Sequence, residues 1–142
     1  MLTRGLLTAI IMKIKPGDTA SVSKTITDDD IHKFADVSGD HNPLHLNDEF
    51  ARTTRFGRRI AHGMLTASLI SSVIANQLPG QGSIYLSQTL KFIAPVFPDD
   101  TVTARVTVVS VRADKPIVKL ETICTNQRDE VVIKGEATVL VS

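Results

Sequence analysis

Hydrophobic and polar residues change their spacing near the middle of the chain, and this change separates two sets of elements. Before residue 80, apolar positions recur every three or four residues, as on one face of a helix. After residue 83 they recur every second residue, as in half-buried strands. The pattern predicts mainly helices first and a long sheet afterwards, with one earlier alternating strand over residues 19–27.

Residues 62–78 are apolar on most faces of a predicted helix, and residues 60–90 contain no charged side chain. Such a segment is either a buried helix or a membrane span. Polar residues interrupt it, and Pro79-Gly80 ends it before the roughly 20 apolar residues that a span needs. We therefore expect a buried core helix, about 26 Å long for seventeen residues at the usual rise.

Two shorter helices are expected before this segment. Thr27 and Asp30 have the spacing of a capping box at the start of the first one, and Gly39 is a natural end for it. A polar loop is expected over residues 38–47. Asn47 is then placed to cap the second short helix, which ends near residue 57.

Four strands are predicted after the apolar helix, over residues 84–92, 101–108, 117–125 and 131–141. Short polar turns join the later strands, which indicates antiparallel pairing. Gly135 interrupts the last strand and suggests a bulge or a close backbone approach. One apolar helix with a long antiparallel sheet predicts an α+β domain in which the sheet wraps around the helix.

Composition narrows the classes of function. A length of 142 residues suits one domain with one core, so we expect a single domain over residues 1–142. Sixteen basic and 15 acidic side chains leave a formal charge of +1, which offers no strong field for nucleic acid or an acidic membrane. Cys124 is the only cysteine, so no disulfide closes within the chain. This favours a reducing compartment, and we expect the cytoplasm, with the mitochondrial matrix as an alternative.

Residues 1–12 allow several interpretations. Leu6 to Met12 is mostly apolar, but a secretory signal has a longer apolar run and a small-residue cleavage site. A weak organelle-targeting segment, an unstructured extension or a start upstream of Met12 fits this segment equally well.

Candidate catalytic residues gather in the polar loop. Asp40, His41 and His45 lie within six residues of one another, and loops held by a rigid scaffold commonly carry catalytic groups. Histidine titrates near neutral pH, and a neighbouring carboxylate can orient it and share its proton. The alternative is that Asp40 only caps a turn and that both histidines are solvated.

His62-Gly63, at the head of the apolar helix, is a second candidate. A helix N-terminus presents unpaired N–H groups and a partial positive charge, and Gly63 would let a substrate carbonyl approach its backbone N–H. The alternative is a cap with a tight packing contact. Arg55, Arg58 and Arg59 form a basic cluster, which is either a solvated face or a contact for an anionic group near the site.

Other chemistries lack their motifs. Asp40, His41 and His45 come without an HExxH arrangement or a cysteine cluster, so we expect no metal. There is also no GxSxG elbow, GxGxxG fingerprint or Walker loop.

Three segments carry a resemblance to a known family. The segment GDHNPLH, followed by IAHGM and then by GSIYLSQTLKFIAPVFPDDTV, resembles the MaoC-like hot-dog proteins, the (R)-specific enoyl-CoA hydratases. The likeness runs from about Pro16 to Val141. It implies a hot-dog fold, in which an antiparallel sheet wraps around a long central helix. It also implies hydration of trans-2-enoyl-CoA to (R)-3-hydroxyacyl-CoA by a homodimer.

The resemblance implies roles for individual residues. Asp40 and His45 match the catalytic pair that holds and activates water, and Gly63 matches the residue whose backbone N–H polarises the thioester carbonyl. The expected supporting residues are Asn42, His62 and Ser71. No metal or redox cofactor is implied, because coenzyme A is part of the substrate.

Three other functions fit the same fold. A 3-hydroxyacyl-[acyl-carrier-protein] dehydratase of fatty-acid synthesis would use the same residues in the reverse direction. A hot-dog thioesterase would release a free thiol. A non-catalytic acyl-thioester-binding domain would bind without turnover, and the intact pair of Asp40 and His45 argues against it.

Overall fold

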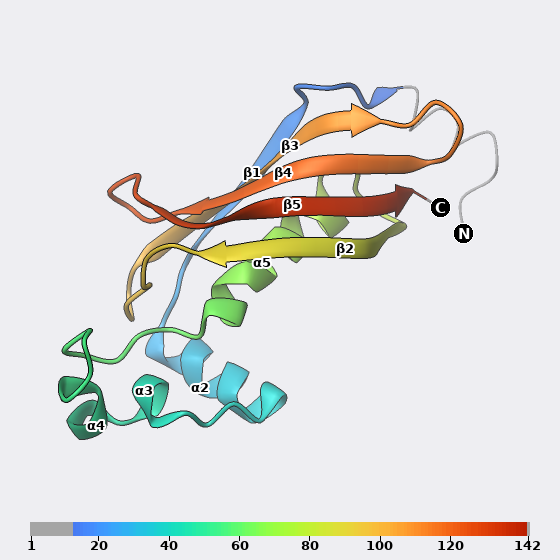
Figure 1. The fold of residues 1–142 in the computed structure, drawn as a ribbon. Helices are drawn as coiled ribbons and strands as arrows, with labels where there is room; N and C mark the ends of the chain where they lie inside the picture. The colour runs from blue at the N-terminus through green and yellow to red at the C-terminus, as the bar shows by residue number, and fades with distance from the viewer. Residues whose placement is uncertain (1–12, 142) are drawn as a thin grey trace.

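A five-stranded antiparallel sheet forms one layer of the molecule, and helices form the other (Figure 1). The computed structural model describes residues 13–141, so the expectations for residues 1–12 concern positions outside this range. The strand order is β1-β3-β4-β5-β2. The strands are β1 (Thr19–Thr25), β2 (Ser83–Phe92), β3 (Thr101–Val111), β4 (Ile117–Thr125) and β5 (Val131–Val141).

The period of two predicted from the sequence puts one face of the central strands in the core. In β3 and β4, alternate residues are buried and the residues between them are more exposed. The buried residues are Val102, Ala104, Val106, Val108, Val118, Leu120, Thr122 and Cys124. Burial raises the pKa of the Cys124 thiol to about 12, so this cysteine is an unreactive core residue.

The central helix α5 (Gly63–Asn76) lies against the inner face of the sheet (Figure 1). Its sheet-facing residues, such as Ile70 and Val73, are fully buried. The expected core helix is therefore buried against the sheet, but its other side is not covered, since Met64 is 56% exposed and Ser71 is also exposed. One sheet can cover only one face of a helix. Among residues 13–141, no helix is long and apolar enough to cross a membrane.

Helix α2 (Asp28–Ser38) begins and ends where the capping pattern predicts. The Asp30 N–H donates to the Thr27 hydroxyl at 3.1 Å, and the Thr27 N–H donates to the Asp30 carboxylate at 3.0 Å. Gly39 closes the helix with a φ of 80°, a left-handed conformation that glycine adopts without steric cost. The chain thus leaves α2 with Asp40 as its next residue.

The expected loop over residues 38–47 contains a short helix, α3 (Pro43–Leu46). Asn42 accepts a hydrogen bond from the Leu44 N–H at 3.1 Å, and proline is favoured at the first helical position. Asn-Pro therefore starts a helix here, where the sequence suggested only a turn. Helix α4 (Asp48–Arg52) follows and is capped by Asn47 as predicted, but it ends earlier than expected. His45 consequently lies on a helix.

Gly135 confirms the expected close backbone approach. A Cβ at this position would lie 1.8 Å from the Thr89 carbonyl oxygen, which belongs to the neighbouring strand β2. The register shifts of β5 lie elsewhere: between Tyr85 and Ser87 in its pairing with β2, and between Cys124 and Thr125 in its pairing with β4. Glycine is therefore required at 135 by the contact between the strands and not by a kink.

Candidate active site

A cleft of about 540 Å³ opens where the short helices meet the head of α5 and the end of β2. Its polar lining includes Asp40, His45, His62 and Gly63. Its apolar lining includes Phe92, Ile93, Ala94, Pro95, Val96 and Ile133. A cleft with an apolar wall and a few converging polar groups is typical of a small-molecule site.

His45 lies on α3 and is 7% exposed. Its Nδ1 lies 2.8 Å from the Ile60 carbonyl oxygen. Because a carbonyl oxygen can only accept, Nδ1 carries the proton of the neutral ring. Nε2 is then left with a free lone pair, which is the requirement for a general base.

Asp40 reaches the cleft from the turn between α2 and α3. Its backbone N–H donates to the Ser38 hydroxyl at 3.1 Å, and its carboxylate accepts a hydrogen bond from the Asn42 N–H at 3.2 Å. The residue is exposed, so water and substrate can reach the carboxylate. This arrangement places an accessible carboxylate at the rim of the cleft.

His62 is almost fully buried, with 1% of its surface exposed. Its Nε2 donates to the Asp40 carbonyl oxygen at 3.0 Å, and its ring packs on the His45 ring with centroids 4.0 Å apart. Burial lowers the pKa of His62, and the opposing effect of its hydrogen bond to the Asp40 carbonyl is smaller, so the ring is neutral at pH 7. His62 therefore joins the Asp40 turn to the head of α5 and supports the ring of His45.

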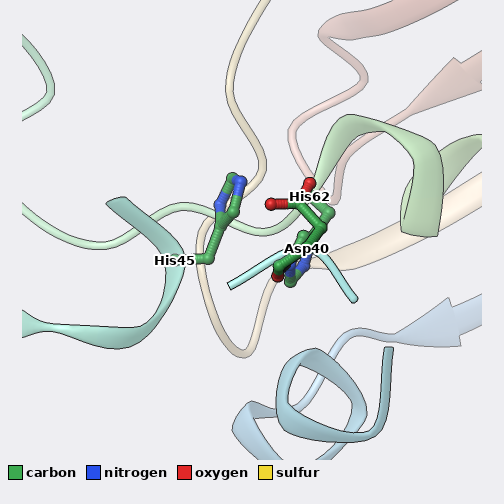
Figure 2. A group of neighbouring side chains, drawn as sticks. All are labelled: Asp40, His45 and His62. Atoms are coloured by element: carbon green, nitrogen blue, oxygen red, sulfur yellow. Dashed lines mark hydrogen bonds between the residues drawn. The ribbon is translucent and has the colours of Figure 1, made fainter. Parts of the chain in front are cut away.

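Asp40, His45 and His62 form one cluster, shown in Figure 2, in which one ligand atom from each lies within 4.8 Å of the others. Two imidazoles and a carboxylate could hold a divalent cation. His41, which the sequence places in the same loop, does not join the cluster: its Nε2 lies 3.8 Å from the Asp36 carboxylate. The cluster thus combines residues from two separate sequence motifs.

Gly63 is the first residue of α5, where backbone N–H groups have no partner within the helix. It lines the same cleft as Asp40 and His45. A Cβ at Gly63 would lie 2.6 Å from Cε1 of Phe92, which is closer than atoms can approach without movement. The absence of a side chain therefore keeps the head of α5 and Phe92 close together beside the cleft.

The other two supporting residues lie outside the cleft lining. Asn42 caps α3 and holds the turn that carries Asp40. Ser71 is exposed and lies two turns along α5 from Gly63, about 12 Å further along the helix axis at 1.5 Å per residue. Within residues 13–141 of this chain, the structure does not bring Ser71 to Asp40 and His45.

Sequence reasoning missed two parts of the site: its apolar wall and the contacts that Arg59 makes beside His45. Phe92 ends β2, residues 93–96 follow it, and Ile133 comes from β5 beside it. Their spacing carries no chemical motif, but residues 92–96 fall inside the third segment of the family resemblance. The sequence left the basic cluster as a solvated face or a contact for an anionic group, whereas the Arg59 side chain is 17% exposed and is hydrogen-bonded to residues of this chain.

Comparison with known proteins gives consistent matches. The MaoC like domain family matches residues 13–131. An (R)-specific enoyl-CoA hydratase from Rhodospirillum rubrum is 53% identical over 128 residues, which cover 90% of this chain and 88% of the relative. A mitochondrial 3-hydroxyacyl-[acyl-carrier-protein] dehydratase from Arabidopsis thaliana is 38% identical over 131 residues, which cover 90% of this chain and 78% of the relative. The solved structure of an (R)-hydratase from A. caviae, described as involved in PHA biosynthesis, superposes with a TM-score of 0.89 at 47% identity, covering 92% and 98% of the two chains.

These matches and the geometry of the cleft point to the same residues. GDHNPLH supplies Asp40 and His45, and IAHGM supplies His62 and Gly63, so the motifs behind the resemblance meet in one site. The sheet wrapped on α5 is the hot-dog architecture of the superposed hydratase. Since the family matches most of the sequence and a relative is 53% identical over nearly its whole length, the chain belongs to the MaoC-like domain family.

Proposed function

We propose that this protein is an (R)-specific enoyl-CoA hydratase, which adds water to trans-2-enoyl-CoA and yields (R)-3-hydroxyacyl-CoA. The observation that carries the proposal is the convergence of Asp40, His45 and Gly63 on one cleft with an apolar wall. The hydratase from Rhodospirillum rubrum, at 53% identity, supports the same reaction.

The chemistry follows from the positions of these groups. Water adds as hydroxide to the β-carbon, and the negative charge moves to the thioester oxygen. Asp40 and His45 hold the water and take its proton, with the free Nε2 of His45 as an acceptor, and the same pair then delivers a proton to the α-carbon. The N–H of Gly63, at the positive end of α5, stabilises the enolate oxygen; one such donor is worth about 3 kcal/mol in other enzymes. No step is assigned to a metal or a redox cofactor.

Coenzyme A is the proposed carrier. Arg55 lines the cleft and is exposed, so it offers a cation to the phosphates of the carrier. The second candidate is a dehydratase acting on acyl-carrier-protein thioesters, which the relative from Arabidopsis thaliana favours. Rates on matched coenzyme A and carrier-protein thioesters separate the two, and we expect the faster turnover on coenzyme A.

The direct test is the absorbance of a conjugated enoyl thioester such as crotonyl-CoA, followed by the chirality of the product. We expect the absorbance to fall and the product to be the (R)-3-hydroxyacyl thioester. An (S) product or a free thiol would contradict the proposal. Binding without any loss of absorbance would instead identify a non-catalytic acyl-thioester domain.

We further propose that the enzyme is a cytoplasmic homodimer. Large exposed apolar residues lie on the uncovered side of α5, on the edge strand β2 and directly after that strand. They are Met64, Ile84, Tyr85, Leu86, Phe92 and Ile93. A second copy would cover them and would bring the exposed Ser71 into an interface. Light scattering at micromolar concentration is expected to give twice the mass of 15.4 kDa, and a monomer would contradict this.

Gly63→Ala tests the role of the bare helix head. The added methyl would overlap the Phe92 ring, which must then move at the rim of the cleft. We expect kcat/KM to fall about tenfold or more, because misplacement of about 1 Å can cost that much in rate. The double variant Gly63→Ala with Phe92→Ala removes the overlap and should recover part of the rate. No change in the single variant would contradict the need for a residue without a side chain at this position.

A further inference from the structure

The inference concerns Arg59, and it rests on the proposed function of the cleft. Its guanidinium contacts three acceptors on three helices. Nε donates to the Asp48 carboxylate of α4 at 2.8 Å, and Nη1 donates to the Asp28 carboxylate at the start of α2. Nη1 also donates to the backbone carbonyl oxygen of His45 at 3.2 Å. Arg59 thus joins α2, α3 and α4 around a single side chain.

Helix α3 needs such support because it has only 4 residues. A helix this short has little stability of its own, and its last carbonyl groups lack partners within it. Two of these carbonyls are bound by consecutive residues. The Ile60 N–H donates to the Leu44 carbonyl at 3.4 Å, and Arg59 donates to the His45 carbonyl.

The same two residues also fix the ring of His45. The Ile60 carbonyl accepts the Nδ1 proton of His45 at 2.8 Å, while Arg59 holds the backbone of that residue. The segment of Arg59 and Ile60 therefore binds both the ring and the backbone of His45. Removing the Arg59 side chain would leave the backbone carbonyl of His45 without this donor.

We propose that Arg59 is a positioning residue for hydration: it holds His45 so that Nε2 meets the attacking water. It does not touch the reacting atoms. Arginine suits the task because its planar fork can bind several acceptors at once, whereas lysine presents one point charge. The paired carboxylates keep the pKa of Arg59 raised, and the guanidinium keeps the pKa of Asp48 lowered, so both partners of this contact are charged at neutral pH.

The neighbouring Arg58 provides a matched control. Its guanidinium lies 3.7 Å from the centre of the Phe97 ring, and it does not line the cleft. Arg58→Met and Arg59→Met remove the same charge and the same hydrogen-bonding group one residue apart. A general loss of positive charge would lower the activity of both variants alike. The loss of the contacts that Arg59 makes with Asp28, Asp48 and the His45 carbonyl would lower the activity of Arg59→Met alone.

We expect Arg59→Met to lower kcat by about 10- to 100-fold with KM nearly unchanged, as for a misplaced catalytic group. Arg59→Lys should fall between it and wild type, and Arg58→Met should stay within about twofold of wild type. Asp48→Asn weakens one of the contacts of Arg59, so it should also lower kcat. If Arg59→Met does not fold, Arg59→Lys and Asp48→Asn carry the test.

A second readout separates this inference from the proposed function. In ¹⁵N-labelled protein, the Nδ1 proton of His45 should give a protected resonance because it is bonded to the Ile60 carbonyl. We expect that resonance to broaden or disappear in Arg59→Met and to remain in Arg58→Met, whether or not the protein hydrates crotonyl-CoA. An unchanged resonance together with a kcat equal to that of Arg58→Met would overturn the inference.

Discussion

Asp40→Asn and His45→Gln are each expected to abolish hydration while the fold persists. Both substitutions keep a side chain of similar size that can form hydrogen bonds. The new amide side chains cannot take up or release a proton near neutral pH. Proton transfer by a positioned side chain contributes about 10²- to 10⁴-fold to rate. We therefore expect kcat for crotonyl-CoA to fall by at least about 10²-fold in each variant.

The fold should survive because neither side chain belongs to the hydrophobic core, although His45 is buried beside the cleft. Asp40 is exposed, and an asparagine oxygen can still accept the Asn42 N–H. Glutamine at 45 has an amide N–H that can turn toward the Ile60 carbonyl in place of Nδ1. The measurements are the loss of enoyl absorbance and the thermal midpoint of each variant.

His41→Gln is the matched control for the histidine. His41 lies in the same loop as His45, but its ring faces Asp36 and Gly39 and does not line the cleft. Its variant should hydrate crotonyl-CoA at nearly the wild-type rate. If Asp40→Asn or His45→Gln also kept that rate, the assignment of the pair would be wrong.

Local patterns predicted most of the fold because the forces behind them are local. The capping box of Thr27 and Asp30 closes within four residues, and β4 follows the alternation that the core face requires. Helix α3 was missed because Asn-Pro is compatible with both a turn and a helix start, and only tertiary contacts decide between them. The exposed side of α5 was missed because hydropathy does not say which surface covers a helix.

The site shows the same division between local and tertiary information. Asp40 and His45 are five residues apart and Gly63 heads a helix, so sequence and family resemblance together sufficed to name them. The link from His62 to the Asp40 carbonyl spans 22 residues. The contact of Arg59 with Asp28 spans 31 residues. Contacts between residues so far apart in the sequence leave no periodic pattern. A run of basic residues has the same sequence whether its side chains are solvated or form ion pairs.

Gly135→Ala is expected to cause the largest loss of stability among the substitutions considered. Gly135 lies in β5, paired with Leu90 of β2 on one side and with Thr122 of β4 on the other. The new Cβ would lie 1.8 Å from the Thr89 carbonyl oxygen and 2.7 Å from its carbon. Backbone atoms of a paired strand cannot turn away as a flexible side chain can. The strand β2 must therefore separate from β5 near the end that leads into the cleft wall.

We expect Gly135→Ala to lower the free energy of unfolding by about 3 kcal/mol or more, since overpacking against fixed backbone lies at the high end of such effects. Denaturant unfolding measures this directly, and thermal scans should show a drop of about 10 °C. Gly57→Ala is the control: its Cβ would meet nothing within 4 Å, and only its φ of 71° is unfavourable for alanine. That variant should lose about 1 kcal/mol. Equal losses of stability at the two glycines would show that β2 and β5 are not in contact at Thr89. The apolar wall of the cleft could then not be formed by these two strands.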